Sequence, residues 1–404
     1  MPEAVIVAHT RTPIGRAMKG SLKDVRAEDL AAAAIDSALA TVPQLSRDEI
    51  GDLLLGCALP GGEQGGNMAR RLAVQLGMDA LPGATITRFC SSSLQTTRMA
   101  FHAIKAGEGT AFISAGVESV SSTVRGSSEH PGTEHSLFDQ SRARTAARNI
   151  SNTPWTDPRR DGLLPDVYIN MGETAENVVS LTGISRARQD EWAVRSQNRA
   201  EAAVGRGHFQ REITPIKLPD GTVISADDGP RPGTTYDAVS QLKPVFRESG
   251  TVTAGNSCPI NDGGAALIVM SDIRARELGI TPLARVISTG VTALSPEIMG
   301  LGPIEATKQA LAHAGMSISD IELAEINEAF AVQVLGSADA LKLDEDKINI
   351  NGGAIALGHP YGMTGARITG ALINNLRTQD KTIGLETMCV GGGQGMAMLI
   401  ERLS

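Results

Sequence analysis

Two cysteines and one histidine of this chain stand in sequence contexts that suit covalent chemistry. Cys90 follows an apolar run and is followed by three serines and a helical pattern. His359 lies between a glycine and a proline, and Cys389 comes just before the glycine run 391–393. A thiol, an imidazole and a second thiol on turns of this kind predict acyl transfer through a covalent intermediate, with a separate acid and base.

Each of the three residues also has an ordinary structural explanation. A helix N-terminus favours a thiolate, so we expect a lowered pKa for Cys90, but a small core residue is the alternative, as we expect for Cys57. His359 could instead be a turn histidine bonded to the backbone. The glycines after Cys389 would let backbone N–H groups converge on a ligand, as in an oxyanion hole. They make a poor dinucleotide-binding fingerprint, because no acidic residue follows about 20 positions later.

The segments that must position these residues alternate between strand and helix patterns. Apolar runs in the first third predict strands at 4–8, 52–59, 84–89 and 111–117. Between them, apolar residues recur at helical spacing from Leu30 to Val42 and from Leu94 to Ile104. This alternation predicts a layered α/β domain.

The last third of the chain repeats the order of the first. A helix at 303–313 and the strand after it correspond to the first helix and its following strand. A strand at 354–357, the turn at His359 and a helix at 365–376 correspond to the strand, turn and helix around Cys90. We therefore predict a duplicated domain in which the two turns face each other.

Residues 121–250, between these parts, have a different character. They are rich in Ser, Gly, Pro, Arg and Asp, and they include both tryptophans. We predict one clear helix there, at 185–205, within an inserted loop subdomain of the kind that often carries specificity. The predicted domains are therefore 1–273, which includes the loop subdomain, and 274–404.

Composition narrows the class of function. The chain has 404 residues and a net charge of −8, and an acidic surface disfavours nucleic acid and anionic membranes as partners. No apolar run reaches 18 residues, so we expect no membrane insertion. The N-terminus lacks the basic and apolar regions of a signal peptide, and the four cysteines are far apart. We expect a cytoplasmic protein with reduced thiols and no metal site.

The sequence blocks around these residues resemble those of thiolases, in family order and over the full length. The catalytic blocks are 88–92, 327–330, 352–360 and 389–395, and the substrate-loop blocks are 171–177 and 253–263. The resemblance implies a thiolase-like duplicated domain, layered αβαβα with mixed five-stranded sheets. It also implies CoA-dependent thiolytic cleavage of 3-oxoacyl-CoA, reversible as a Claisen condensation, in fatty-acid or lipid β-oxidation. Acyl-CoA and CoA would be substrates, no cofactor would be needed, and the chain would form a homodimer or homotetramer.

The same resemblance implies residue roles. Cys90 would be the acylated nucleophile, His359 its base, and Cys389 the acid and base at the acetyl methyl carbon. Asn327, through a water, would join His359 in one oxyanion hole, and the N–H groups of Cys90 and Gly391 would form a second. The pantetheine tunnel would be lined by Met171, Phe246, Ala254, Met299, Ala329 and Phe330, each of which could instead be plain core. Cations for the 3′-phosphate of CoA would come from Arg211, Lys217, Arg231 or Lys243, although a solvated basic face is the commoner explanation for such residues.

Three positions depart from the family pattern. Ser93 stands where thiolases usually have Gly, so we expect altered backbone geometry near Cys90. Cys258 occupies a tunnel position where many members have Ser, which would weaken a hydrogen bond to pantetheine and add a third thiol. Asn170 replaces a His often found in acetoacetyl-specific members, which favours a degradative enzyme over a short-chain biosynthetic one.

Two other functions stay open. A decarboxylating condensing enzyme would share the fold but would use two histidines, or His and Asn, without the second cysteine; Cys389 argues against it. A catalytically silent acyl-CoA- or lipid-binding module, or a scaffold for a β-oxidation complex, would be expected to lack catalytic residues. All four of Cys90, Asn327, His359 and Cys389 are present.

Overall fold

A ten-stranded mixed sheet is the framework of the computed structural model, which describes residues 1–125, 134–151 and 153–404. The N-terminal half contributes β1 (Ala4–Arg11), β8 (Asn261–Ser271), β5 (Ala111–Ser119), β3 (Leu53–Gly56) and β4 (Gly83–Ile86), with the short β2 (Gly15–Arg16) beside β8. The C-terminal half contributes β9 (Ala284–Ala293), β12 (Gln394–Arg402), β11 (Ile383–Val390) and β10 (Leu323–Ile326). Antiparallel pairing of Val5 with Arg285 and of Ile6 with Ala284 joins β1 to β9, so the two halves continue into each other.

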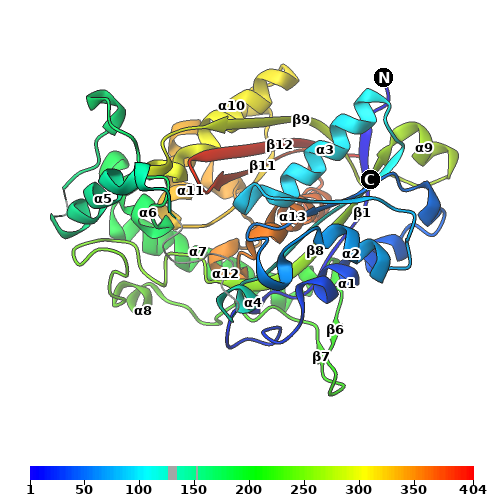
Figure 1. The fold of residues 1–404 in the computed structure, drawn as a ribbon, viewed down its shortest axis with the longest axis horizontal. Helices are drawn as coiled ribbons and strands as arrows, with labels where there is room; N and C mark the ends of the chain where they lie inside the picture. Colours follow the sequence, from blue (N-terminus) through cyan, green and yellow to red (C-terminus); the bar gives the residue numbers. More distant parts are fainter. Residues whose placement is uncertain (126–133, 152) are drawn as a thin grey trace.

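Helices cover both outer faces and fill the space between the halves (Figure 1). On the outside, α1 (Ala27–Ala40) and α2 (Met68–Gln75) pack on the N-terminal strands, and α10 (Gly302–Ala314) packs on β9 and β12. α11 (Ala331–Leu341) packs beside α10, and α9 (Asp272–Glu277) follows β8. Between the halves, α3 (Ser92–Ala106) and α13 (Thr364–Thr378) contact each other; α3 packs on the N-terminal strands, and α13 packs on strands of both halves. The predicted layered α/β class is therefore confirmed.

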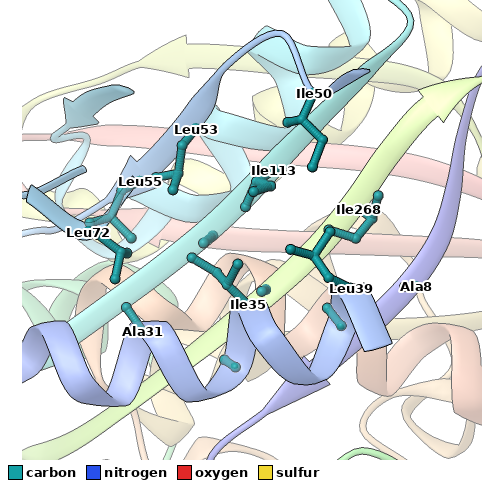
Figure 2. Packing of buried hydrophobic residues seen from close by; sticks show 14 of the residues in the cluster. Ala8, Ala31, Ile35, Leu39, Ile50, Leu53, Leu55, Leu72, Ile113 and Ile268 are labelled. Carbon is teal, nitrogen blue, oxygen red and sulfur yellow. The ribbon is translucent and has the colours of Figure 1, made fainter. Parts of the chain in front are cut away.

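Helix α1 shows how the outer layers are held. Alanines dominate its sequence and give it high helix propensity, and its first turn carries acidic residues that suit the positive helix end. Ala31, Ile35 and Leu39, spaced four apart, face Ile113 and Ile268 of the sheet (Figure 2). Each fully buried Leu or Ile side chain contributes about 1.5–3 kcal/mol of hydrophobic free energy. This packing makes the sheet a rigid base for the loops at its edge.

The two central helices cross at very close range. A Cβ atom on Gly365 of α13 would overlap the backbone nitrogen of Leu94 in α3. The backbone N–H of Ala366 donates a hydrogen bond to Ser93 Oγ at 2.9 Å. The turns that precede the helices, Phe89–Ser91 and Tyr361–Met363, also contact each other. The turn that carries Cys90 therefore meets the turn that follows His359.

One predicted strand is wrong. Residues 354–357 form a single helical turn, α12 (Ala354–Leu357), bracketed by Gly352 at φ +85° and Gly358 at φ +113°. On its side away from β11, β10 instead forms an isolated parallel bridge between Ala324 and Ile348. A four-residue apolar run has the same pattern whether it is a buried strand or a buried helical turn. Cys90 and His359 are consequently not at equivalent positions, since Cys90 adjoins α3 and His359 lies five residues before α13.

The predicted loop subdomain contains more helix than the one segment expected. It holds α4 (Val120–Arg125), α5 (Asp139–Ser151), α6 (Met171–Thr182), α7 (Arg186–Gly205), α8 (Tyr236–Ser240) and a hairpin of β6 (Ile216–Lys217) and β7 (Val223–Ile224). Sequence patterns missed α5 because most of its residues are polar, so no apolar period shows. Residues 126–133 and 152 of this segment lie outside the described residues.

Candidate active site

Cys90 lies on a sharp turn between β4 and α3. The residue before it, Phe89, has a φ of +42°, a left-handed conformation that costs a non-glycine residue about 1–2 kcal/mol. Arg88 braces the turn, because its Nε donates to Gln95 Oε1 at 3.0 Å and its guanidinium also donates to Gln394 Oε1 at 2.9 Å. The strained and braced turn places the Cys90 thiol, half-buried, at the N-terminal end of α3.

The protonation state of Cys90 differs from the one that its position predicted. Burial raises the pKa of the Cys90 thiol to about 11, although the backbone N–H of Gly391 and its own N–H favour the thiolate. The negative charge of Glu118 raises this pKa further. The expectation of a lowered pKa is therefore wrong for the resting site, because desolvation outweighs the helix terminus. The thiol is protonated at neutral pH and needs a base before it can act as a nucleophile.

His359 is buried and held in one orientation. Its backbone N–H donates to Asn261 Oδ1 at 2.9 Å, and its Nδ1 lies 2.7 Å from Thr364 Oγ1. The Thr364 hydroxyl donates its own hydrogen to the Pro360 carbonyl at 2.8 Å, so it accepts from Nδ1–H. The ring proton is thereby assigned to Nδ1, so the lone pair is on Nε2.

The charge state of His359 suits a base. Burial lowers the pKa of His359 to about 3, and the positive charge of Arg367 contributes to this shift. The imidazole is therefore neutral at physiological pH. Asn327 Nδ2 lies 3.2 Å from Nε2 and donates to it, whereas the buried Asn327 Oδ1 has no hydrogen-bond partner within the described part of the chain. A neutral imidazole with an available Nε2 is the form that accepts a proton.

Cys389 and Gly391 lie on the hairpin between β11 and β12. The three-residue turn 391–393 needs its glycines, since Gly392 and Gly393 have φ values of +75° and +78°. The N–H of Gly391 favours the Cys90 thiolate, so this turn reaches the nucleophile. Burial raises the pKa of Cys389 well above its usual value, and the charges of Cys90 and Cys258 raise it further. The three thiols thus interact electrostatically within one site.

Glu328 ties the loops of the site together. Its buried carboxylate accepts hydrogen bonds from Trp192 Nε1, Ser196 Oγ, Asn349 Nδ2 and the backbone N–H of Ile355, at 2.7 to 3.1 Å. These donors come from α7, from the residues before α12 and from α12 itself. One carboxylate therefore fixes the segment that carries Asn327 against the segment that leads to His359.

Most of the predicted tunnel residues come together in one apolar cluster. The rings of Phe246 and Phe330 meet edge to face with centroids 6.3 Å apart, and Met171, Met299 and Ala329 pack with them. The N–H of Cys258 donates to the Ala329 carbonyl at 3.1 Å, which joins the loop at 253–258 to the segment after Asn327. Ala254 lies exposed on the same loop.

Two predicted residues stand apart from this cluster. Asn170 is exposed and caps α6, where its Oδ1 accepts the N–H of Gly172 at 2.9 Å. Arg211 lines a groove that shares no lining residue with the catalytic or tunnel residues. Its proposed contact with the 3′-phosphate of CoA therefore has no support from its position.

Sequence patterns gave no role to Thr364 or Tyr361, and they missed what Ser93 does. The Tyr361 ring meets the His359 ring edge to face at 5.1 Å, and burial followed by the charges of Cys258 and Cys90 raises its pKa. Its position two residues after His359 was the only available signal. Ser93, the departure from the family glycine, accepts the N–H of Ala366 and so caps the N-terminal turn of α13.

Comparisons with known proteins agree with a cysteine-dependent acyltransferase, the class to which this fold and this grouping of thiols and imidazole point. Residues 4–273 match the thiolase N-terminal domain and residues 280–402 match the thiolase C-terminal domain. The chain belongs to the thiolase family, and it is an acyltransferase.

The full-length relatives carry two different names. The chain is 40% identical to a 3-ketoacyl-CoA thiolase of Bacillus subtilis (strain 168), over 99% of this chain and 100% of that protein. It is also 40% identical to an acetyl-CoA acetyltransferase of Escherichia coli (strain K12), over 100% of both. A solved human mitochondrial 3-ketoacyl-CoA thiolase in complex with CoA superposes with a TM-score of 0.86 at 35% identity, over 100% of this chain and 98% of that one. The crystal structure of the Bacillus anthracis acetyl-CoA acetyltransferase gives a TM-score of 0.87 at 37% identity, over 100% and 99%.

Within the described ranges, the structure contains no helix with the length and apolar character needed to cross a membrane.

Proposed function

We propose that this thiolase cleaves 3-oxoacyl-CoA with free CoA, giving acetyl-CoA and an acyl-CoA shortened by two carbons, in fatty-acid or lipid β-oxidation. The observation that carries the proposal is a half-buried Cys90 thiol at the Gly391 N–H, beside the turn that follows a neutral His359, at the junction of the two halves. The full-length relatives named 3-ketoacyl-CoA thiolase support the same reaction.

The first half of the reaction forms an acyl-enzyme. His359 Nε2 accepts the Cys90 proton while the Cys90 sulfur attacks the 3-keto carbon. The tetrahedral oxyanion is held by the N–H groups of Cys90 and Gly391. The bond between C2 and C3 then breaks, and its electron pair passes to the acetyl-CoA unit as an enolate. The His359 Nε2–H, now a donor, and a water held by the unpaired Asn327 Oδ1 stabilise the enolate oxygen.

The second half transfers the acyl group. The Cys389 thiol protonates the enolate carbon, and acetyl-CoA leaves. The resulting Cys389 thiolate takes the proton of an incoming CoA thiol. The CoA sulfur attacks the acyl carbon, and the Cys90 sulfur leaves and recovers its proton from His359. A buried Cys389 with a raised pKa is a thiol between turnovers, so it can serve as the acid.

CoA acts here as a substrate, and the mechanism uses no cofactor. The apolar cluster of Phe246, Phe330 and Met171 supplies the surface against which pantetheine would lie, with Cys258 at its edge. We propose that the domains 1–273 and 274–404 each contribute one side of the active site. The four cysteines are free in the structure, which agrees with a reducing cytoplasm.

The open edge of the sheet supports a homodimer as the basic assembly. The edge strand β4 pairs with β3 on one side, and within the described residues no strand pairs with its other side. Phe89, three residues after the end of β4, is 43% exposed. An unpaired edge is a template for antiparallel pairing with a second copy about a twofold axis. Light scattering at micromolar concentration distinguishes monomer, dimer and tetramer.

A short-chain biosynthetic acetoacetyl-CoA thiolase is the second candidate. The relatives named acetyl-CoA acetyltransferase, at 40% and 37% identity, favour it. Asn170, the basis for preferring the degradative type, lies exposed on the α6 cap. Substrate length therefore has to be decided by measurement.

The test is CoA-dependent loss of the enolate absorbance of acetoacetyl-CoA and of a longer 3-oxoacyl-CoA, with Cys90→Ala and Cys389→Ala alongside. Cleavage of the longer substrate, lost in both variants, supports the degradative thiolase. Cleavage of acetoacetyl-CoA alone replaces it with the biosynthetic type. If the folded protein binds CoA but cleaves neither substrate, the degradative and the biosynthetic proposals are both contradicted. The catalytically silent binding module is then the function that fits.

A further inference from the structure

A wide basic groove lies apart from the catalytic site. Its cavity volume is about 1180 Å³, and its walls come from β1, the residues after α1, the end of α7, the loop at 279–283 and the end of α13. None of the catalytic or tunnel residues lines it. It is therefore a separate feature of the surface with no part in the proposed reaction.

The charge of the groove is opposite in sign to that of the whole chain. Three arginines (Arg206, Arg211 and Arg377) and two histidines (His9 and His208) line it, and its described lining contains no Asp or Glu. The chain as a whole carries −8. In an acidic protein, a concave surface with three guanidinium groups and no lining carboxylate concentrates anions locally.

The acidic residues that follow Arg211 and Arg377 most closely in sequence are paired with other residues. Glu212, next to Arg211 in sequence, binds Arg11 at 2.7 Å and Asn374 Nδ2 at 3.0 Å. Asp380, three residues after Arg377, binds Arg402 at 2.8 Å.

The guanidinium groups themselves are largely unused. Arg211 and Arg377 have no ion pair or side-chain hydrogen bond to any other described residue, and both are exposed. Arg206 donates only to the neutral Asn351. Burial lowers the pKa of His208; the negative charge of Glu212 opposes this shift, and the charges of Arg206 and Arg211 add to it. These charged groups therefore lie close together at one end of the groove. The guanidinium N–H groups of Arg211 and Arg377 therefore remain free to bind a ligand, because the neighbouring carboxylates of Glu212 and Asp380 pair with other arginines.

We propose that this groove binds a polyphosphate-bearing anion, either free polyphosphate or a nucleotide with two or more phosphates. Guanidinium groups bind phosphate oxygens through two parallel N–H donors, and several of them together prefer a multiply charged ligand. The cavity exceeds the usual range of about 300–1,000 Å³ for small-molecule sites, so a nucleotide fits. Val42, Ile280 and Leu283 also line the groove and offer apolar surface to a base.

The test is isothermal titration of the full-length protein with inorganic tripolyphosphate and with ATP. CoA is held at saturation throughout, because CoA is itself a nucleotide and its tunnel must be occupied. The groove variant is Arg211→Ala/Arg377→Ala. The matched control is Arg159→Ala/Arg160→Ala, which removes the same charge from an exposed turn outside the groove. Unchanged thiolase kinetics show that each variant is folded.

We expect one ligand per chain, with affinity at least tenfold weaker in the groove variant, unchanged in the control, and falling as salt rises. Binding of both ligands, or of tripolyphosphate alone, shows that the phosphates suffice. Binding of ATP alone identifies a nucleotide site. Absence of binding by both ligands at millimolar concentration, or an equal loss in the control, overturns the proposal.

Discussion

The imidazole Nδ1 of His359 lies 2.7 Å from the hydroxyl of Thr364, and that hydroxyl is itself turned toward the Pro360 carbonyl. The two contacts together decide which ring nitrogen carries the proton. Thr364 touches no reacting atom, so it acts as a positioning residue for the base.

Replacing Thr364 with Val should therefore lower kcat by about 10- to 100-fold, by analogy with the loss of a partner that orients a metal-ligating histidine. Thr364→Ser keeps the hydroxyl and should retain most of the activity. Steady-state thiolysis across pH 6–9 measures this. A merely structural role predicts instead that Val and Ser variants lose activity in parallel with thermal stability.

The raised pKa of Cys90 predicts how the free thiol reacts. Only the thiolate is alkylated, so the rate for Cys90 with iodoacetamide should be low at pH 7 and rise about tenfold per pH unit up to pH 10. Peptide mapping by mass spectrometry separates Cys90 from the half-buried Cys258. A rate that levels off below pH 8 contradicts a protonated resting thiol and indicates a thiolate–imidazolium pair.

Glu325 links stability to pH. Burial raises its pKa to about 8 in the folded chain, against an ordinary value near 4.5. The folded state holds a proton that the unfolded state has lost, so this stabilising contribution is complete below pH 4.5 and disappears as pH rises through 8. Glu325→Gln removes the titration. Between pH 5.5 and pH 8.5, the Tm of the Glu325→Gln variant should therefore rise relative to the Tm of the parent protein. A Tm difference that stays constant with pH would refute this.

Replacing two helical glycines with alanine should change the free energy of unfolding in opposite directions. Gly365 lies at the crossing of α3 and α13, where a Cβ would overlap the Leu94 backbone, so Gly365→Ala should destabilise the fold by about 1–3 kcal/mol. Gly205, at the end of α7, has open space around its Cβ position. Gly205→Ala should stabilise by about 0.5–1 kcal/mol through helix propensity. Urea unfolding gives both values, and equal effects would mean that the crossing can relax.

The sequence by itself determined the layered α/β class, the duplicated halves and the family, because strand and helix periods and ordered motif blocks are local properties. Local patterns also placed Cys90 and His359 on turns before central helices. They failed at 354–357, where four apolar residues cannot distinguish a strand from a helical turn, and at α5, whose polar surface shows no period.

Only the tertiary structure decided the charge states and the supporting contacts. The helix terminus suggested a thiolate at Cys90, but desolvation depends on the residues that cover it, and these come from both halves of the chain. Thr364 fixes the His359 tautomer, Glu328 collects four donors from distant segments, and Ser93 caps α13 across the helix crossing. None of these contacts has a sequence period, because each joins groups whose spacing is set by packing. The basic groove is likewise a product of packing. It brings Arg206 and Arg211 together with Arg377, which lies 171 and 166 residues later in the sequence.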